Sequence, residues 1–137
     1  IYSDNHYTKI SIPEKIPLEQ LEILCEIISK NGWMRKLNIE GNGFCDDELS
    51  YILNKLAQKN NYLKELNINF NNIGDKSIQA LAQFIKRSKY SVQRIFAKSC
   101  FLHFSVIKDL LTEINKTVED ASVLHELVID YKMNDTE

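Results

Sequence analysis

The chain has 137 residues, of which 44% are hydrophobic and 26% charged, a composition typical of one globular domain with a buried core. Its formal charge of −2 provides no basic field, and no stretch reaches the roughly 20 apolar residues of a membrane-spanning helix, so we expect neither a nucleic-acid nor a membrane partner. Three scattered cysteines without a C-x-x-C pair favour free thiols in a reducing, cytoplasmic environment.

Residues 7–32 predict a short strand followed by an amphipathic helix. The apolar residues of the strand are Tyr7, Ile10 and Ile12. The helix is expected to start near Pro17 and to stop at Asn31-Gly32, with its apolar residues three and four positions apart. Those residues are Leu21, Leu24, Cys25 and Ile28.

The next segments repeat one phrase. Leu37 to Asn42 reads LNIEGN, and Leu66 to Asn71 reads LNINFN, 29 residues later. A further step of 29 places Ile95 on Leu66 and Cys100 on Asn71, so a third copy keeps the apolar positions while its polar residues change. In each copy, apolar residues two positions apart predict a short strand with one buried face.

After each of these strands the apolar spacing changes to that of a helix. The three sets are Leu49, Ile52, Leu53 and Leu56; Ile78, Leu81, Ala82 and Ile85; and Ile107, Leu110, Leu111 and Ile114. A last strand with Leu124, Leu127 and Ile129 follows, which gives offsets of 27, 29, 29 and 32 residues between successive strands. The long last offset indicates an enlarged loop at residues 116–122.

A strand and a helix of this size cannot bury their apolar faces alone, so the copies must stack on one another. Strands joined by right-handed helical crossovers lie parallel and form an inner sheet with the helices outside. The sequence therefore predicts an α/β fold, a solenoid of about four to five repeats that forms a single domain over residues 1–137.

The repeats resemble those of leucine-rich repeat proteins of the ribonuclease-inhibitor-like class, in which L-x-x-L-x-L is followed by Asn or Cys and then by a full helix. Asn42, Asn71 and Cys100 hold the Asn-or-Cys position, whereas the terminal copies have Lys15 and Lys132 there. A buried amide at this position offers hydrogen bonds to the backbone groups left unpaired where the chain turns out of the sheet. The resemblance implies a noncatalytic domain that binds a protein partner on its concave sheet.

The acidic residues near helix starts, Asp46, Asp47 and Asp75, are interpreted as N-caps, because no His or nucleophile keeps a fixed place beside them. Cys100 and His103 form only half of a zinc site. No glycine-rich phosphate loop is present. We therefore predict no catalytic residue, no cofactor, no metal site and no enzyme activity.

Strand alternation predicts which residues face outward on the concave side. They are Lys9 and Ser11; Lys36, Asn38 and Glu40; Glu65, Asn67 and Asn69; Arg94, Phe96 and Lys98; and Glu126, Val128 and Asp130. Phe96 differs from its repeat equivalents Asn38 and Asn67, and an exposed aromatic residue between cations is typical of a binding hot spot.

The expected partner-binding residues form one cluster around the third repeat strand. They are Arg94, Phe96, Lys98, Val128, Asn67 and Asn69, with Phe70 and Phe101 extending the surface along the rim. In the alternative interpretation, the third repeat shifts its register and buries Phe96.

The predicted concave face is small. Strands about 4.8 Å apart, with three outward residues each, give only a few hundred Å², below the roughly 800 Å² that a stable interface takes from each partner. Neither terminal strand has an evident polar cap over its stacking face. We therefore expect a fragment of a longer protein, or a chain whose exposed ends associate with another copy.

The resemblance leaves the biological role and the partner's identity open. Leucine-rich repeat proteins serve in ribonuclease inhibition, immune sensing, GTPase activation and as bacterial effectors inside host cells. The Lys-, Asn- and Ile-rich composition suggests an AT-rich genome and favours a host-directed effector, working in the host cytosol, or a protist protein. The alternative function is regulation of a small GTPase, as in leucine-rich repeat GTPase activators.

Overall fold

The computed structural model describes residues 7–11, 16–30, 32, 34–59, 62–88, 90–98, 104–118, 124 and 126–129. Within these residues, strands and helices alternate along the chain. The elements are β1 (Tyr7–Lys9), α1 (Leu18–Lys30), β2 (Lys36–Asn38), α2 (Asp46–Lys59), β3 (Glu65–Asn67), α3 (Asp75–Arg87), β4 (Arg94–Ala97), α4 (Phe104–Val118) and β5 (Glu126–Ile129).

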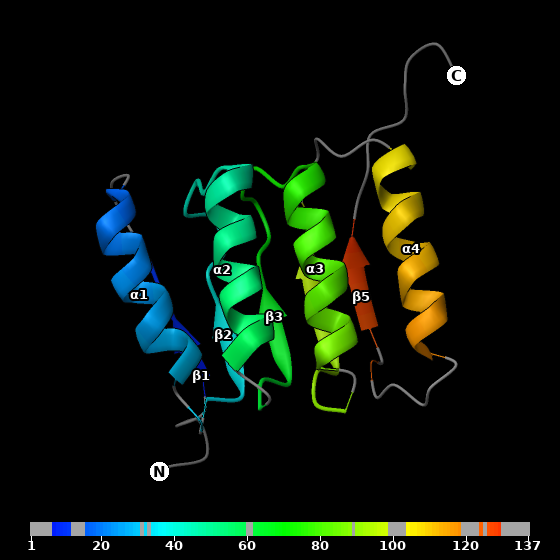
Figure 1. Ribbon diagram of the computed structural model, residues 1–137, viewed down its shortest axis with the longest axis horizontal. Helices are drawn as coiled ribbons and strands as arrows, with labels where there is room; N and C mark the ends of the chain where they lie inside the picture. The colour runs from blue at the N-terminus through cyan, green and yellow to red at the C-terminus, as the bar shows by residue number, and fades with distance from the viewer. Residues whose placement is uncertain are drawn as a thin grey trace.

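The strands form one parallel sheet in the order β1-β2-β3-β4-β5. Each helix connects two neighbouring strands, as a crossover between parallel strands must. Figure 1 shows α1 to α4 side by side in one layer, all on the same face of the sheet. We call the opposite face of the sheet the open face. The predicted α/β class and the repeated strand–helix unit are confirmed.

The strand register follows a step of 29 residues through most of the sheet. Leu37 lies opposite Leu66, and Leu66 lies opposite Ile95, as expected. Ile95 lies opposite Leu127, which confirms the predicted offset of 32. The first offset was wrong: Thr8 lies opposite Leu37, so this step is also 29 and not 27.

The predicted offset was wrong because Thr8 is not apolar. The apolar pattern therefore placed Ile10, and not Thr8, opposite Leu37. A slip of two residues keeps every side chain on the same face of a strand. Lys9 and Ser11 accordingly remain exposed, as expected of outward residues. The Lys15 position of this copy lies outside the described residues.

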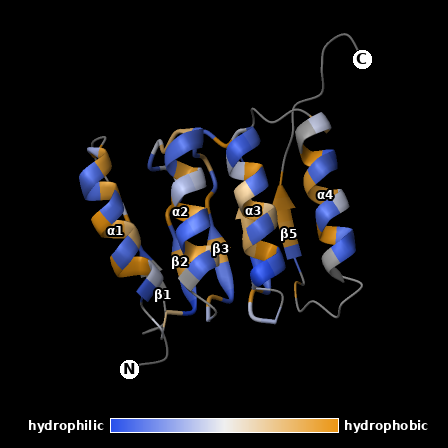
Figure 2. Ribbon diagram, in the orientation of Figure 1, coloured by the Kyte–Doolittle hydropathy of each residue, from blue (hydrophilic) through white to orange (hydrophobic). Residues whose placement is uncertain are grey.

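The core lies between the sheet and the helix layer. Each central strand contributes a buried residue, Leu37, Leu66 or Ile95, and the predicted apolar stripes of α1, α2 and α3 pack against them. Figure 2 shows hydrophilic and hydrophobic bands alternating along these helices, as amphipathic helices require. Leu111 of α4 departs from the prediction because it is exposed.

The asparagines at the strand exits make the hydrogen bonds expected of them. The Nδ2 of buried Asn71 donates to the carbonyls of Ile68 and Ile39, both at 3.1 Å. One repeat earlier, the Nδ2 of Asn42 donates to the carbonyls of Ile39 and Ile10, at 3.0 and 2.9 Å. Each amide thus joins its own strand exit to that of the preceding repeat, which confirms the predicted role.

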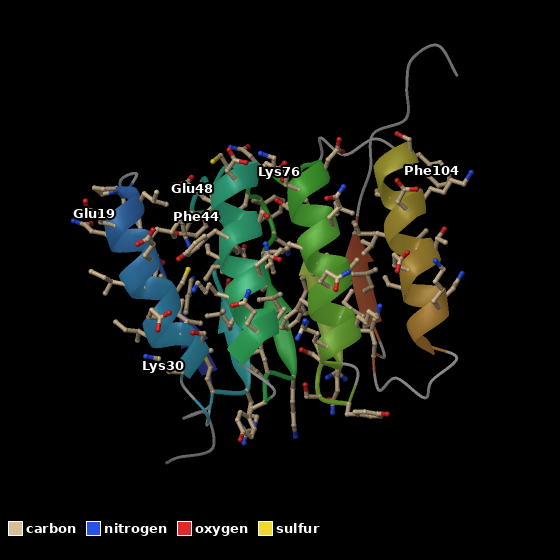
Figure 3. The ribbon with its side chains drawn as sticks, in the orientation of Figure 1. Glu19, Lys30, Phe44, Glu48, Lys76 and Phe104 are labelled. Atoms are coloured by element: carbon tan, nitrogen blue, oxygen red, sulfur yellow. The ribbon has the colours of Figure 1, made fainter. Side chains whose placement is uncertain are left out.

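The start of α2 is capped differently from the prediction. The helix begins at Asp46, so this residue lies inside the first turn instead of preceding it. The backbone N–H of Cys45 donates to Oε1 of Glu48 at 3.0 Å, which is half of a capping box. Asp47 forms an exposed ion pair with Lys76 at 2.6 Å. Figure 3 shows Glu48 and Lys76 at the same end of the helix layer.

Asp46 caps the helix of the next repeat. Its carboxylate accepts the backbone N–H groups of Gly74, Lys76 and Ser77, at 3.0, 3.1 and 2.8 Å, and the hydroxyl of Ser77. Asp75 does not cap its own helix, because α3 begins at Asp75 and its N-cap position is Gly74. Sequence spacing alone places an acid near a helix start but does not say which helix it reaches.

The hydrogen bonds change the acidity of Asp46. Partial burial raises the pKa of its carboxyl, but the bonds from Ser77, Lys76 and Gly74 outweigh this effect, and the net pKa is lowered. A Cβ added at Gly74 would lie 2.8 Å from Cγ of Asp46. Glycine is therefore what allows the carboxylate to approach the start of α3 this closely.

Candidate protein-interaction surface

Phe96 lies on the open face of β4. Burial along this strand alternates, with Ile95 and Ala97 buried and Arg94 and Phe96 at least partly exposed. In the sheet register Phe96 stands between Asn67 of β3 and Val128 of β5. The alternative in which a register shift buries Phe96 is therefore wrong.

A row of alternating charges crosses the open face beside Phe96. Nζ of Lys36 lies 3.9 Å from Oε2 of Glu65, and Nε of Arg94 lies 3.6 Å from Oε1 of Glu126. Both pairs are partly exposed to solvent and their charged atoms are more than 3.5 Å apart, so each contributes little to folding stability. Their effect is to fix a row of alternating cations and carboxylates across β2 to β5 on the open face.

The outward asparagines hold the strand exits in shape. The Nδ2 of Asn67 donates to Oε2 of Glu40 at 2.7 Å, and its Oδ1 accepts the backbone N–H of Asn69 at 3.0 Å. The Oδ1 of Asn69 in turn accepts the backbone N–H of Lys98 at 2.7 Å. This role was not predicted from the sequence, although a side-chain oxygen that bonds the backbone two residues on is a common Asn turn.

Phe70 stands in a backbone conformation that favours glycine. Its φ is 61°, and its repeat equivalent Gly41 has a φ of 68°. A non-glycine residue in the left-handed region carries a conformational cost of about 1 kcal/mol or more. The Phe70 side chain is 55% exposed, so burial offsets little of this cost.

The predicted binding residues come together at β4. The backbone N–H of Phe70 donates to the carbonyl of Lys98 at 2.6 Å, which brings the exit of β3 beside the end of β4. The β4 patch is our name for the set Arg94, Phe96, Lys98, Val128, Asn67, Asn69 and Phe70. Phe101, expected to extend it, lies outside the described residues, as do Asp130 and Cys100.

The described residues offer few features of an enzyme site. They contain no group of three His, Cys, Asp or Glu side chains that could hold a metal ion. A hollow of about 630 Å³ on the helix layer is lined mainly by polar residues, among them Asn54, Gln79 and Glu113. Burial raises the pKa of the Cys25 thiol to about 11, so it is not a ready nucleophile at neutral pH. No helix in the described part of the chain is both long and apolar enough to cross a membrane.

Comparison with known sequences supports a leucine-rich repeat protein. The family model described as "Leucine Rich repeat" matches residues 59–82, a segment that contains β3 and the first half of α3. The match does not specify the ribonuclease-inhibitor-like class. A search of the curated proteins finds no match. Leucine-rich repeats are generally noncatalytic, and this repeat suggests a protein-interaction domain.

Proposed function

We propose that this chain is a protein-interaction domain, a leucine-rich repeat solenoid that binds a partner protein through its β4 patch. The supporting observation is the placement of Phe70. A large aromatic side chain, more than half exposed, occupies a strained turn position that the preceding repeat fills with glycine. Strain of this kind is typical of functional sites, and exposed aromatic residues are typical of binding hot spots.

Phe96 supplies a second aromatic residue, and the residues around it indicate the chemistry of the partner. Arg94 and Lys98 flank it on β4 and are both exposed, while Val128 lies beside it on β5. Arg94 already pairs with Glu126 at 3.6 Å, so Lys98 is the cation beside this aromatic anchor that a carboxylate at the rim of an apolar pocket would meet. The partner is therefore a protein surface with a cavity that accepts one or two phenyl rings and a carboxylate at its rim.

The size of the open face sets the strength of this contact. The flat area of the sheet is a few hundred Å², against about 800 Å² per partner in a stable interface. Contacts beyond the sheet, from loops or from further repeats, must complete a tight complex. In isolation, the chain is expected to bind its partner weakly and with fast dissociation.

The test is affinity capture from cell lysate with wild-type chain and with Phe70→Gly and Phe96→Ala as separate baits. Phe70→Gly removes the side chain and the backbone strain together, so it should lower binding without lowering the denaturant midpoint. Tyr90→Ala is the matched control, because Tyr90 is an exposed aromatic residue outside the β4 patch. If Phe70→Gly and Phe96→Ala retained every partner of the wild-type chain as fully as Tyr90→Ala does, the proposed surface would be refuted.

The biological role follows from the captured partner. A host protein recovered through the β4 patch supports a host-directed effector acting in the host cytosol. GTP turnover by a panel of small GTPases separates this from GTPase regulation, since acceleration by the wild-type chain favours the latter.

A further inference from the structure

One flank of each helix faces the helix before it. Equivalent positions in the four helices are counted from the first buried apolar side chain described in each. These side chains are Leu21, Leu49, Ile78 and Ile107. In α3, Ala80 and Phe84 lie on the flank toward α2 and are 3% and 0% exposed. In α2, the residue equivalent to Phe84 is Lys55, whose Nζ lies 3.7 Å from Oε1 of Glu26 on α1.

The same flank of α1 is apolar and uncovered. The α1 equivalents of Ala80 and Phe84 are Ile23 and Ile27, which are 61% and 65% exposed. Among the described residues, no helix precedes α1. Two isoleucines four residues apart form a continuous apolar strip along a helix, at the positions that α3 buries.

The opposite flank, which faces the following helix, is apolar and uncovered in α4. Leu111 is 41% exposed, whereas its equivalents Cys25, Leu53 and Ala82 are buried. Phe104 is 48% exposed and is equivalent to Asp46, the residue that reaches the next helix. Figure 3 shows Phe104 on α4, at the end of the row of helices.

The exposed apolar side chains of the helices thus gather at the two ends of the row. Among described residues, the large exposed apolar side chains on helices are Leu18, Ile23 and Ile27 of α1 and Phe104 and Leu111 of α4. The central helices α2 and α3 expose none of this kind. The two pairs are of opposite sense, since Ile23 and Ile27 of α1 lie on the flank that faces backward along the repeats, whereas Phe104 and Leu111 of α4 lie on the flank that faces forward. Leu18 of α1 is equivalent to Phe104 and therefore lies on the forward flank of its helix.

We propose that a second copy of this chain docks head to tail, with α4 of one copy packed against α1 of the next. This arrangement repeats the helix–helix contact already present within the chain and extends it across the ends. It also places β5 beside β1, the two outer strands of the sheet that the structure describes, where pairing continues a sheet that is parallel throughout. A symmetric α1–α1 contact would oppose two backward-facing flanks and would turn one sheet edge antiparallel to the other.

The contact is weak and does not close on itself. A helix of this length is about 20 Å long, and a strand–helix layer is about 20 Å deep, so each end offers roughly 400 Å² of flat area. A head-to-tail contact between identical chains adds copies one at a time instead of stopping at a dimer. The association is therefore concentration-dependent and produces a ladder of species.

Two blocking variants test the proposal by sedimentation velocity over a wide range of protein concentration. Ile27→Glu blocks the α1 end and Leu111→Glu blocks the α4 end, because each buries a charge in an apolar contact. We expect the wild-type mass to rise with concentration past that of a dimer, and each variant alone to stay monomeric. An equimolar mixture should form a discrete heterodimer and stop there, since it holds one intact α1 end and one intact α4 end that can meet.

Controls keep the result interpretable. Gln83→Glu adds the same charge on the exposed face of α3 and should leave the ladder unchanged. Ile23→Glu and Phe104→Glu repeat the two blocks if either first variant fails a circular-dichroism check of folding. A wild-type chain that stays monomeric at every concentration overturns the proposal. A mixture that forms no heterodimer also overturns it, as does Leu111→Glu alone forming a dimer, which would indicate a symmetric contact.

Discussion

The side chain of Asn71 bonds to the backbone of two repeats from a position that water does not reach. Asn71→Ala should lower the free energy of unfolding by about 2 to 4 kcal/mol, because it leaves buried carbonyls without donors. Urea denaturation measures the change. Asn72→Ala is the matched control, because Asn72 is exposed and its backbone bond to Phe44 survives the substitution. Equal shifts for the two variants would contradict the role of Asn71.

Asp46 gives folding stability a dependence on pH. Because its pKa in the folded chain lies below the ordinary value of 3.8, the unfolded chain binds this proton more tightly. Its contribution is complete above pH 3.8 and is lost as the pH falls through the folded pKa. Asp46→Asn should therefore destabilise the chain at pH 7, and the gap to wild type should close in acid.

The measurement for Asp46 is the denaturant midpoint of both proteins from pH 7 down to about pH 2. Asp47→Asn serves as the control, because Asp47 makes only an exposed ion pair with Lys76 and should shift the midpoint little. A gap between wild type and Asp46→Asn that stays constant across the pH range would show that the carboxylate charge does not stabilise α3.

At the scale of elements, the start of α3 depends on its neighbour α2. Gly74→Ala would place a Cβ 2.8 Å from Cγ of Asp46 and push the carboxylate away from the first turn of α3. We expect a loss of about 1 to 2 kcal/mol, the usual cost of losing a cap. Because both substitutions break the same contact, Gly74→Ala combined with Asp46→Ala should cost less than the sum of the two, as urea denaturation would show. Full additivity would exclude the coupling.

The elements themselves could be predicted well from the sequence, since apolar spacing decides strand or helix locally. Three points could not. The capping partner of Asp46 lies 31 residues away at Ser77, and no local pattern encodes it. The first strand offset was hidden by Thr8, which breaks the apolar pattern. The exposure of Leu111 depends on the spatial neighbours of α4 and not on the sequence of its own helix.

The exposed residues of the candidate surface could also be predicted from the sequence, but their hydrogen bonds could not. Alternation along β4 places Phe96 on the open face, because side chains of a strand point to opposite sides in turn. The left-handed backbone at Phe70 could have been predicted, since its repeat equivalent is Gly41, a residue that favours such a turn. The bonds of Asn67 to Glu40 and of Asn69 to Lys98 join different strands, so they could not be predicted, because their partners depend on the tertiary register.

At the scale of the whole molecule, each repeat is buried by its neighbours, so α3 depends on the helices on both sides of it. Leu81 is fully buried, and Leu81→Ala should lower the free energy of unfolding by about 2 to 5 kcal/mol, because it leaves a cavity between stacked repeats. Leu111→Ala removes the same atoms at an exposed position and should shift stability by about 0.5 kcal/mol or less at concentrations where the chain is monomeric.

Two probes decide whether the Leu81→Ala cavity acts locally or on the whole chain. Far-UV circular dichroism reports all helices, while the single tryptophan, Trp33, reports the segment before β2. Because stacked repeats stabilise one another through their shared interfaces, both probes should move to the same lower urea midpoint. If the tryptophan midpoint stayed at its wild-type value while the dichroism midpoint fell, the repeats would unfold separately and the stacking would not couple them.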